Sequence, residues 1–319
     1  MDKTGIQWTD ATWNPTRGCR RISPGCINCY AEKVAARFCG DGLPYHGLIK
    51  LGKWNGEARF VADKLNLPLQ WRKPRRIFVD SMSDLFYEGF DDWQIAAVFG
   101  VMARAHWHTF QILTKRPDRA LRWCKWWAER ALSHAGGGGV FAQALPAAQA
   151  VKGQSFTVWA GPDNPKRETM IAPGWPLPNV WIGASVENQE YADKRIPDLL
   201  KIPAAVRFIS YEPALGPVNF DLRPMRSGCG PEPIKTTGID WLIVGGESGH
   251  DARLFDIAWA RSAVAQCSTA GVPVFVKQMG ARPSESGKPA LYRDIKGGDM
   301  SEWPEDLRVR DWPAVRPCP

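Results

Sequence analysis

Three cysteines lie close together near the start of the chain, in the segment GCRRISPGCINCYAEK. Their spacing, Cys-x6-Cys-x2-Cys, lets Cys26 and Cys29 reach one metal centre, and the turn at Pro24 brings Cys19 back toward them. A structural zinc site is usually closed by four protein ligands, whereas a catalytic centre leaves one coordination position open for its substrate. Three ligands therefore favour a 4Fe-4S cluster with one iron open to a small chelating ligand.

Two other interpretations of these cysteines stay open. The first is a structural zinc ion whose fourth ligand is Cys39 or His46, and the second is three thiols that bind no metal. Cys124 and Cys267 lie in amphipathic segments, where a thiol packs as a small apolar side chain. The sequence thus offers one candidate metal site, at the N-terminal cysteines.

Charged and hydroxyl side chains follow six apolar runs of the sequence at the points where the runs end. Because parallel strands of an α/β protein place their carboxyl ends at one edge of the sheet, ligands bind where these ends meet loops and helix N-termini. We therefore expect a polar active site at this edge. Helix capping is the competing explanation, and it accounts for Asp91 and Asp256. The candidate catalytic residues at the strand ends are Lys115, Glu212, Glu247 and Lys277.

The elements that position these side chains follow from short runs rich in β-branched and aromatic residues. The runs predict strands at 76–80, 110–114, 180–186, 206–212, 241–245 and 273–277. Apolar residues at helical spacing predict helices at 91–105, 118–134 and 256–270, and a further helix at 30–38 follows the cysteines. Because the strands are apolar on both faces, they predict a parallel sheet covered by helices, in an α/β barrel.

The chain of 319 residues is long enough for one large barrel or for two smaller domains. The regular spacing of the strands favours a single barrel domain over residues 1–319. Residues 135–178, rich in Gly, Ala and Pro, interrupt this spacing and are expected to form a surface insertion. Residues 280–319 are expected to form a C-terminal extension packed on the barrel.

Charge and hydropathy narrow the class of protein. The 41 Lys and Arg exceed the 33 Asp and Glu, giving a net charge of +8 and a pI near 9.1, which favours contact with a polyanion. The 16 tryptophans offer rings that stack on bases, although packing in the core is the simpler explanation. No stretch approaches the ~20 apolar residues of a membrane span, and the N-terminus lacks a signal-peptide pattern. We therefore expect a soluble, cytoplasmic protein without membrane contact, whose cysteines are thiols, metal ligands or catalytic groups rather than disulfides.

These motifs resemble the radical S-adenosylmethionine superfamily, whose cluster loop carries three cysteines ahead of a partial parallel barrel. More closely, the sequence is similar to a phage- and prophage-associated branch with SPGCxNCYAE, DSMSDLF, LTKRP, GASVEN, SYEP, GGESG and WPEDLRVR in this order. The resemblance spans nearly the whole chain. It implies a partial (β/α) TIM-like barrel of parallel strands with an N-terminal iron-sulfur cluster loop, working in the host cytoplasm if the protein is phage-encoded.

The resemblance also implies two cofactors, a 4Fe-4S cluster held by Cys19, Cys26 and Cys29 and S-adenosyl-L-methionine chelated to the open iron. One electron from an external donor would cleave the sulfonium and yield a 5′-deoxyadenosyl radical that abstracts hydrogen from the substrate. Two features depart from the superfamily, because the first cysteine gap is x6 where x3 is usual, and the common glycine-glycine-acid motif is absent. The residues expected to bind the cofactor are Ser81, Ser83, Asp84, Ser185, Glu187, Asn188, Gly245 and Gly246.

The implied function is a radical rearrangement or C–H functionalisation of a nucleic-acid component, with a modified pyrimidine base in phage DNA as the expected substrate. Lys115, Arg116 and Lys277 suit an anionic group of that substrate, such as a phosphate. A base within a duplex has to be flipped out of the stack before it can react. Two other functions stay open: a zinc-stabilised nucleic-acid-binding protein without catalysis, and radical chemistry on a peptide or small metabolite.

Overall fold

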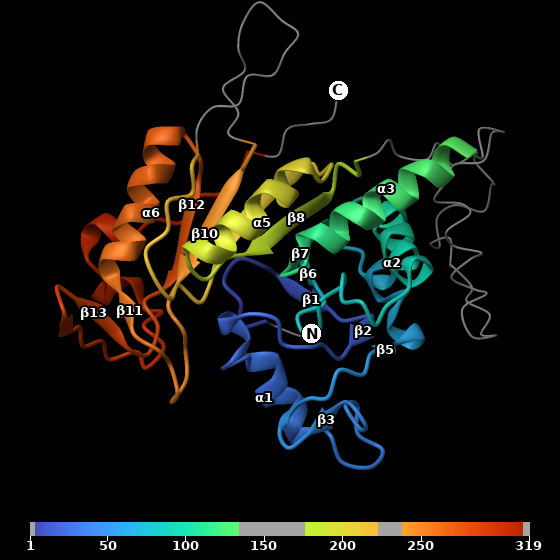
Figure 1. Ribbon diagram of the computed structural model, residues 1–319, viewed down its shortest axis with the longest axis horizontal. Helices are drawn as coiled ribbons and strands as arrows, with labels where there is room; N and C mark the ends of the chain where they lie inside the picture. Colours follow the sequence, from blue (N-terminus) through green and yellow to red (C-terminus); the bar gives the residue numbers. More distant parts are fainter. Residues whose placement is uncertain (1–3, 134–175, 223–237, 315–319) are drawn as a thin grey trace, which may run out of the picture. The chain divides into compact units, whose positions relative to one another are not determined.

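The computed structural model in Figure 1 describes residues 4–133, 176–222 and 238–314. The chain forms two compact units. The N-terminal unit comprises residues 1–21, 29–181 and 202–205, and the C-terminal unit comprises residues 22–28, 182–201 and 206–319. The segment 22–28 therefore belongs to the C-terminal unit, although it lies early in the chain.

The main sheet has seven strands in the hydrogen-bonded order β1-β6-β7-β8-β9-β10-β12. Their bounds are β1 (Ala11–Trp13), β6 (Arg76–Val79), β7 (Thr109–Thr114), β8 (Val180–Ser185), β9 (Val206–Tyr211), β10 (Trp241–Gly245) and β12 (Val274–Gln278). In the N-terminal unit β6 pairs in parallel with β1 and β7, and in the C-terminal unit β10 pairs in parallel with β9 and β12. The predicted α/β fold with a parallel sheet is confirmed, and the six predicted strands are present to within one residue at each end.

The helices of the described residues are α1 (Tyr30–Arg37), α2 (Asp92–Arg104), α3 (Pro117–Ser133), α5 (Gln189–Lys201) and α6 (Ile257–Ala270). Four of them were predicted, and their ends agree to within one residue. Asp91 accepts from the Gln94 amide and the Gln94 side chain accepts in return, which forms a capping box on α2. Asp256 accepts from the Ala258 amide and caps α6. Helix capping therefore explains both aspartates, as expected.

Short elements complete each unit. The N-terminal unit has the antiparallel pairs β2 (Thr16–Arg17) with β5 (Arg59–Phe60) and β3 (Ile49–Lys50) with β4 (Lys53–Trp54), and the turns η2 (Ala62–Lys64) and η3 (Leu67–Gln70). The C-terminal unit has η1 (Pro24–Cys26), β11 (Phe255–Asp256), β13 (Pro283–Glu285), β14 (Lys288–Pro289), η5 (Met300–Glu302) and η6 (Glu305–Leu307).

Buried aromatic rings fill the core of each unit. In the N-terminal unit Trp123 stacks on Phe99 with 4.4 Å between the ring centroids, and both side chains are buried. In the C-terminal unit Trp241 stacks on Trp312 at 5.0 Å and meets Phe275 edge to face. Such rings bury large apolar areas and gain further energy from their mutual geometry. Packing therefore accounts for these tryptophans.

The segment 280–314 is joined to the sheet of the C-terminal unit. The Val276 amide of β12 donates to the Val309 carbonyl at 2.9 Å, and the Trp241 indole of β10 donates to the Asp311 carbonyl at 2.9 Å. These bonds satisfy polar groups at the sheet that would otherwise be buried without a partner. The part of the expected C-terminal extension that the structure describes thus contacts two strands.

Other expectations concern the organisation of the chain. The surface insertion expected at 135–178 falls, up to residue 175, outside the described residues. The single barrel domain over residues 1–319 stays a prediction. Across the three described ranges, no helix has both the length and the hydropathy that a membrane crossing needs.

Candidate functional site

Two groups of side chains, one in each unit, lie where strands of that unit end, and each is a candidate for a functional role. The Cys19 group of the N-terminal unit comprises Cys19, Asp84, Glu88 and Arg116, and follows β6 and β7. The Cys26 group of the C-terminal unit comprises Ser23, Cys26, Asn28, Glu187, Arg195, Glu247 and Arg253, and follows β8 and β10.

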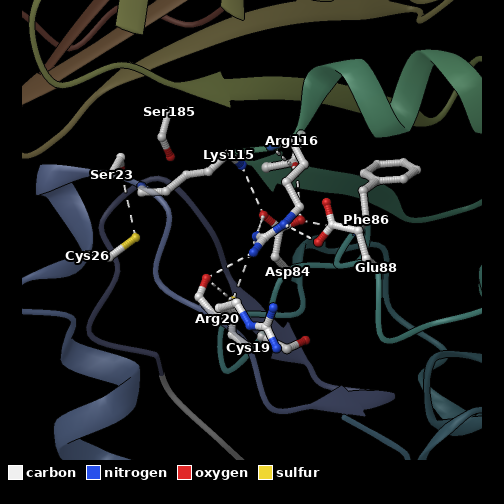
Figure 2. Close-up of polar contacts among 12 residues, drawn as sticks. Cys19, Arg20, Ser23, Cys26, Asp84, Phe86, Glu88, Lys115, Arg116 and Ser185 are labelled. Carbon is white, nitrogen blue, oxygen red and sulfur yellow. Dashed lines mark hydrogen bonds and ion pairs between the residues drawn. The ribbon is translucent and has the colours of Figure 1, made fainter. Parts of the chain in front are cut away.

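Arg116, two residues after β7, is the centre of the Cys19 group. Its side chain is only 3% exposed and donates to carboxylate oxygens of Asp84 and Glu88, each at 3.0 Å. It also donates to the Arg20 carbonyl at 2.9 Å and to Cys19 Sγ at 3.8 Å (Figure 2). Burial alone would lower the pKa of the guanidinium, but Asp84, Cys19 and Glu88 hold that pKa above its usual value. A permanent cation therefore lies beside the Cys19 sulfur.

Asp84 joins the ends of β6 and β7. Its carboxylate is buried and accepts from the Thr114 hydroxyl at 2.7 Å, from the Lys115 amide at 3.0 Å and from Arg116 at 3.0 Å. This number of donors satisfies both oxygens within the unit. The structure thus gives Asp84, a predicted cofactor residue, the task of orienting Arg116. Lys115 is held by its backbone, and its side chain points away from Asp84 (Figure 2).

Asp80, the residue after β6, is buried and has a left-handed φ of 58°. Its Oδ1 accepts from the Thr16 amide at 3.1 Å, whereas Oδ2 makes no hydrogen bond to any described residue. Burial raises the pKa of Asp80 to about 8. The hydroxyl oxygens of Thr16 and Ser83 lie 2.5 Å apart, and the Ser81 hydroxyl donates to Asn14 at 3.1 Å. Ser83 therefore lies beside a carboxyl whose pKa burial raises, whereas the Ser81 hydroxyl is engaged by Asn14.

Cys29 and the two residues considered as a fourth zinc ligand also belong to the N-terminal unit. Cys29 directly precedes α1 as its N-cap residue. Cys39 Sγ donates to the Ala36 carbonyl at 3.2 Å, and His46 Nδ1 lies 3.1 Å from a carboxylate oxygen of Asp41. Cys39 and His46 thus both have local partners in this structure.

The turn that carries Cys26 belongs to the C-terminal unit. Pro24, Gly25 and Cys26 form η1, which is closed by the Cys26 amide donating to the Ser23 carbonyl at 3.0 Å. Pro24 favours this turn because its ring fixes φ near the helical value. The Ser23 hydroxyl lies 3.7 Å from Cys26 Sγ (Figure 2) and donates to Glu187 Oε1 at 2.7 Å. Ser23 therefore links the thiol to a carboxylate.

Glu187 follows β8 and is the most deeply buried charged residue of the Cys26 group, with 0% exposure. Its Oε2 pairs with Arg195 of α5 at 2.9 Å, and Arg195 also donates to the Ser185 carbonyl at 2.8 Å. A Cβ at Gly25 would lie 2.3 Å from Glu187 Oε1, so glycine is the residue that lets the turn approach this carboxylate. The structure gives Glu187, a predicted cofactor residue, contacts that support the turn at Cys26.

A second carboxylate, Glu247 in the loop after β10, holds the same segment at its other end. Asn28 Nδ2 donates to Glu247 Oε2 at 3.0 Å. Arg253 donates to Glu247 through its amide, Nε and Nη2, and its Nη1 donates to the Pro24 carbonyl at 2.8 Å. Burial would raise the pKa of Glu247, but the hydrogen bonds from Arg253 and Asn28 bring that pKa below its usual value. An ionised Glu247 therefore fixes both Asn28 and, through Arg253, the η1 turn.

Two predicted catalytic residues, Glu212 and Lys277, meet at the ends of β9 and β12. Lys277 Nζ lies 2.8 Å from Glu212 Oε1, and both side chains are partly exposed. A Cβ at Gly245 would lie 2.8 Å from that same oxygen, and one at Gly246 would lie 2.4 Å from the Met279 carbonyl. The two glycines therefore allow the ends of neighbouring strands to approach closely. Glu212 and Lys277 form an accessible acid-base pair of the C-terminal unit.

The partners of the buried carboxylates were not predicted from the sequence. Asn188 was expected to bind the cofactor, and here its Oδ1 accepts from the Tyr191 amide at 3.2 Å at the start of α5. Arg195 and Arg253 lie eight and six residues after the glutamates that they pair with. A buried carboxylate requires a cation or several donors, so a search for arginines in the next helix or loop would have found Arg195 and Arg253.

The donor set fits an iron-sulfur cluster by its chemistry. Cys19, Cys26 and Cys29 are partly exposed thiols, and none of the described cysteines forms a disulfide. In contrast, burial raises the pKa of Cys124 and of Cys267 to about 12, so these two stay protonated in the core. In the part of the chain that the structure describes, no three His, Cys, Asp or Glu side chains are arranged around a single metal ion. The fit therefore rests on ligand type and exposure.

Comparisons with known proteins bear on the family of the chain. A search of the curated proteins and a search of the solved structures each found no significant match. Residues 3–304 match the family described as Protein of unknown function (DUF5131). Because this match covers nearly the whole sequence, the chain belongs to the DUF5131 family.

Proposed function

We propose that the protein is a radical S-adenosylmethionine enzyme that acts on a nucleic-acid component, with a modified pyrimidine base in phage DNA as its substrate. The observation that carries the proposal is the support given to the cysteine segment. A buried arginine contacts Cys19, and two buried carboxylates fix the residues on either side of Cys26. Supporting contacts of this kind orient ligands at metal sites, whereas thiols without a ligand role do not require them.

The 4Fe-4S cluster would be held by Cys19, Cys26 and Cys29, with S-adenosylmethionine at the iron that they leave open. When bound, these groups supply a 5′-deoxyadenosyl radical, formed with one electron from an external donor, that abstracts hydrogen from the substrate. The protein itself binds and orients the reactants. A partial (β/α) barrel would gather the carboxyl ends of the parallel strands around them.

The residues of the chain divide into supporting and reacting groups. Glu187 and Glu247 accept hydrogen bonds from segment 22–28, so we assign them the role of positioning this segment. Glu212 and Lys277 remain partly exposed at the strand ends, so Lys277 is placed to bind an anionic group and Glu212 to accept a proton. The Lys115 side chain extends from the end of β7 and is a second group for an anion (Figure 2).

Anaerobic reconstitution of the full chain with iron and sulfide tests the chemistry. After reduction in the presence of S-adenosylmethionine, we expect 5′-deoxyadenosine by mass spectrometry and roughly four irons per chain. Cys26→Ala should abolish both, whereas Cys39→Ala, which removes a partly exposed thiol outside the cluster, should retain both. An intact cluster that yields no 5′-deoxyadenosine would overturn the proposal.

A zinc-stabilised nucleic-acid-binding protein is the second candidate. It would take Cys19, Cys26 and Cys29 together with Cys39 or His46 as the four ligands of a closed zinc site, and it is favoured by the net charge of +8, which suits a polyanion. It predicts about one zinc per chain and no iron after anaerobic purification. In that case one of the two variants Cys39→Ala and His46→Ala, the one that removes the fourth ligand, should release the metal and lower the free energy of unfolding, which separates the two candidates.

A further inference from the structure

The hairpin of β3 and β4 exposes a leucine at its tip. Leu51 and Gly52 form a two-residue turn between the paired residues Lys50 and Lys53. Both turn residues have positive φ, 51° and 73°, a conformation in which this kind of turn usually holds Asn-Gly or Asp-Gly. Leu51 has a branched apolar side chain, which disfavours this backbone conformation, and it is 92% exposed. The tip therefore holds an apolar side chain where both backbone and solvent favour a polar one.

A hairpin of the C-terminal unit has the same turn with ordinary residues. Ser286 and Gly287, with φ of 51° and 76°, join β13 to β14 between the paired residues Glu285 and Lys288. Opposite charges across a strand pair stabilise it, whereas like charges, as in Lys50 opposite Lys53, destabilise it. The leucine and the lysine pair of the β3–β4 tip are thus both unfavourable in water. Both become favourable against a partner that is anionic outside and apolar inside.

The base of the β3–β4 hairpin is fixed to α1. The Trp54 amide donates to Glu32 Oε2 at 3.0 Å, and Glu32, buried within α1, also pairs with Arg21. The rings of Trp54 and Tyr45 meet edge to face with 6.2 Å between their centroids. Figure 1 shows β3 beside α1 in the N-terminal unit. The tip therefore projects from a supported base rather than from a loose loop.

Further cations lie in the same part of the N-terminal unit. Arg17 and Arg59 both donate to the Pro44 carbonyl, at 3.0 Å and 3.3 Å, in the segment before β3. The Arg20 guanidinium lies against Gly56, where an added Cβ would be 3.0 Å from Nη2. Arg20 directly follows the first of the three clustered cysteines. Arginine side chains thus lie both next to Cys19, the proposed cluster ligand, and against the segments before and after the β3–β4 hairpin.

We propose that the β3–β4 hairpin is a wedge for duplex nucleic acid, in which Leu51 enters the base stack while Lys50 and Lys53 contact phosphates. Apolar wedges of this kind unstack a base step and kink the duplex. An unstacked base is easier to flip out, which a duplex substrate requires. The inference rests on the proposed function for its substrate class, and it adds the element that would open the duplex around the base.

Binding of a short labelled DNA duplex to the full chain, over a series of salt concentrations, tests the wedge. Wild-type protein should bind with an affinity that falls with salt and should raise the fluorescence of a 2-aminopurine within the duplex. Lys53→Glu gives the β3–β4 hairpin a pair of opposite charges like that of β13–β14, so the hairpin should stay folded. It should weaken binding about tenfold and lower the slope of log affinity against log salt concentration by about one or more. Leu51→Asn restores the preferred turn residue and should keep the salt slope but abolish the 2-aminopurine signal.

Ser286→Asn and Lys288→Glu, at the corresponding positions of the β13–β14 hairpin, are matched controls and should change neither readout. Full binding by Lys53→Glu, or a 2-aminopurine signal that survives Leu51→Asn, overturns the wedge. So does competition by phosphatidylserine vesicles that depends on Leu51, because it would assign the tip to a membrane surface.

The binding measurements need no iron, so they are independent of the radical chemistry. Formation of 5′-deoxyadenosine without duplex binding overturns the wedge alone. Duplex binding with all the expected variant effects, but without 5′-deoxyadenosine, supports the wedge and overturns the proposed enzyme.

Discussion

A buried arginine-carboxylate pair stands at the strand ends of each unit, and the two pairs present opposite charges to the cysteine segment. In the N-terminal unit Arg116 is bonded to Asp84 and donates to Cys19 Sγ. In the C-terminal unit Glu187 is bonded to Arg195 and accepts from the residue before the η1 turn. The first pair therefore contacts a thiol, and the second contacts the hydroxyl of Ser23, which directly precedes the turn that carries Cys26.

This difference separates electrostatic support from geometric support. A cation beside Cys19 stabilises negative charge on that sulfur, and hydrogen bonds to cluster sulfurs also tune the reduction potential. A carboxylate in the same place would disfavour a thiolate, and Glu187 is linked to Cys26 through the Ser23 hydroxyl. The cation Arg116 thus contacts sulfur directly. The anions Glu187 and Glu247 instead accept hydrogen bonds from a hydroxyl, an amide and a guanidinium.

The largest expected effect comes from breaking the pair in the C-terminal unit. Glu187→Ala leaves Arg195 buried without its carboxylate, so the free energy of unfolding should fall by about 3–5 kcal/mol in urea denaturation. Glu190→Ala is the matched control, because Glu190 also pairs with a cation but is 58% exposed, and it should cost less than about 0.5 kcal/mol. Equal losses in the two variants would show that the buried pair has no special role.

The next largest loss of unfolding free energy is expected when one arginine of each unit is replaced by lysine. Arg116→Lys keeps the charge but cannot bond Asp84, Glu88, Arg20 and Cys19 together, so we expect a loss of about 2–3 kcal/mol. Arg253→Lys, at a more exposed position, should cost about 1 kcal/mol. Chemical denaturation of the two variants gives the comparison. A larger loss for Arg253→Lys would contradict the view that the Cys19 group is the more tightly built.

A smaller loss of unfolding free energy is expected for a substitution at Gly25, where the η1 turn lies close to Glu187. Gly25→Ala places a Cβ 2.3 Å from a carboxylate that Arg195 holds in place, so it should cost about 1–2 kcal/mol. Gly216→Ala is the control, since the nearest atom would be 3.8 Å away, and it should stay within about 0.5 kcal/mol of wild type. In a Glu187→Ala background the cost of Gly25→Ala should shrink, because the obstructing atoms are gone. Strict additivity of the two changes would refute the contact.

The fold was predictable wherever a pattern extends over many residues. Parallel strands buried on both faces leave unbroken apolar runs, and these predicted β6 to β10 and β12. The edge strand β1 has three residues, too few for a pattern, and α5 contains Pro197, which usually ends a helix. The elements that escaped prediction are therefore those that tertiary contacts hold in place.

The positions of polar residues in the site were easier to predict than their roles. Glu212 and Lys277 were each predicted as catalytic candidates at strand ends, and their contact with each other was not predicted. Glu187 and Glu247 were expected at the cofactor and the substrate, and the structure shows both engaged with segment 22–28. A carboxylate at a strand end has the same sequence pattern in either role. The role of such a carboxylate depends on the residue that it bonds. For Glu247 one such residue is Asn28, 219 residues away in the sequence.

The smallest expected change, counted per pH unit, is in how the free energy of unfolding depends on pH. This dependence has opposite signs for Asp80 in the N-terminal unit and Glu247 in the C-terminal unit. The pKa of buried Asp80 is about 8 against a usual 3.8, so the folded state retains a proton that the unfolded state loses. Its contribution to stability is complete below the usual pKa and is lost as the pH rises toward 8, by roughly 1 kcal/mol per pH unit. Asp80→Asn carries no such proton, and asparagine tolerates the φ of 58°, so its unfolding free energy should vary less between about pH 5 and 7. Glu247 has a lowered pKa, so its contribution is present above the usual value and is lost on acidification; Glu247→Gln should flatten the acid side instead. Parallel pH profiles for wild type and Asp80→Asn would show that Asp80 is ionised in the folded protein.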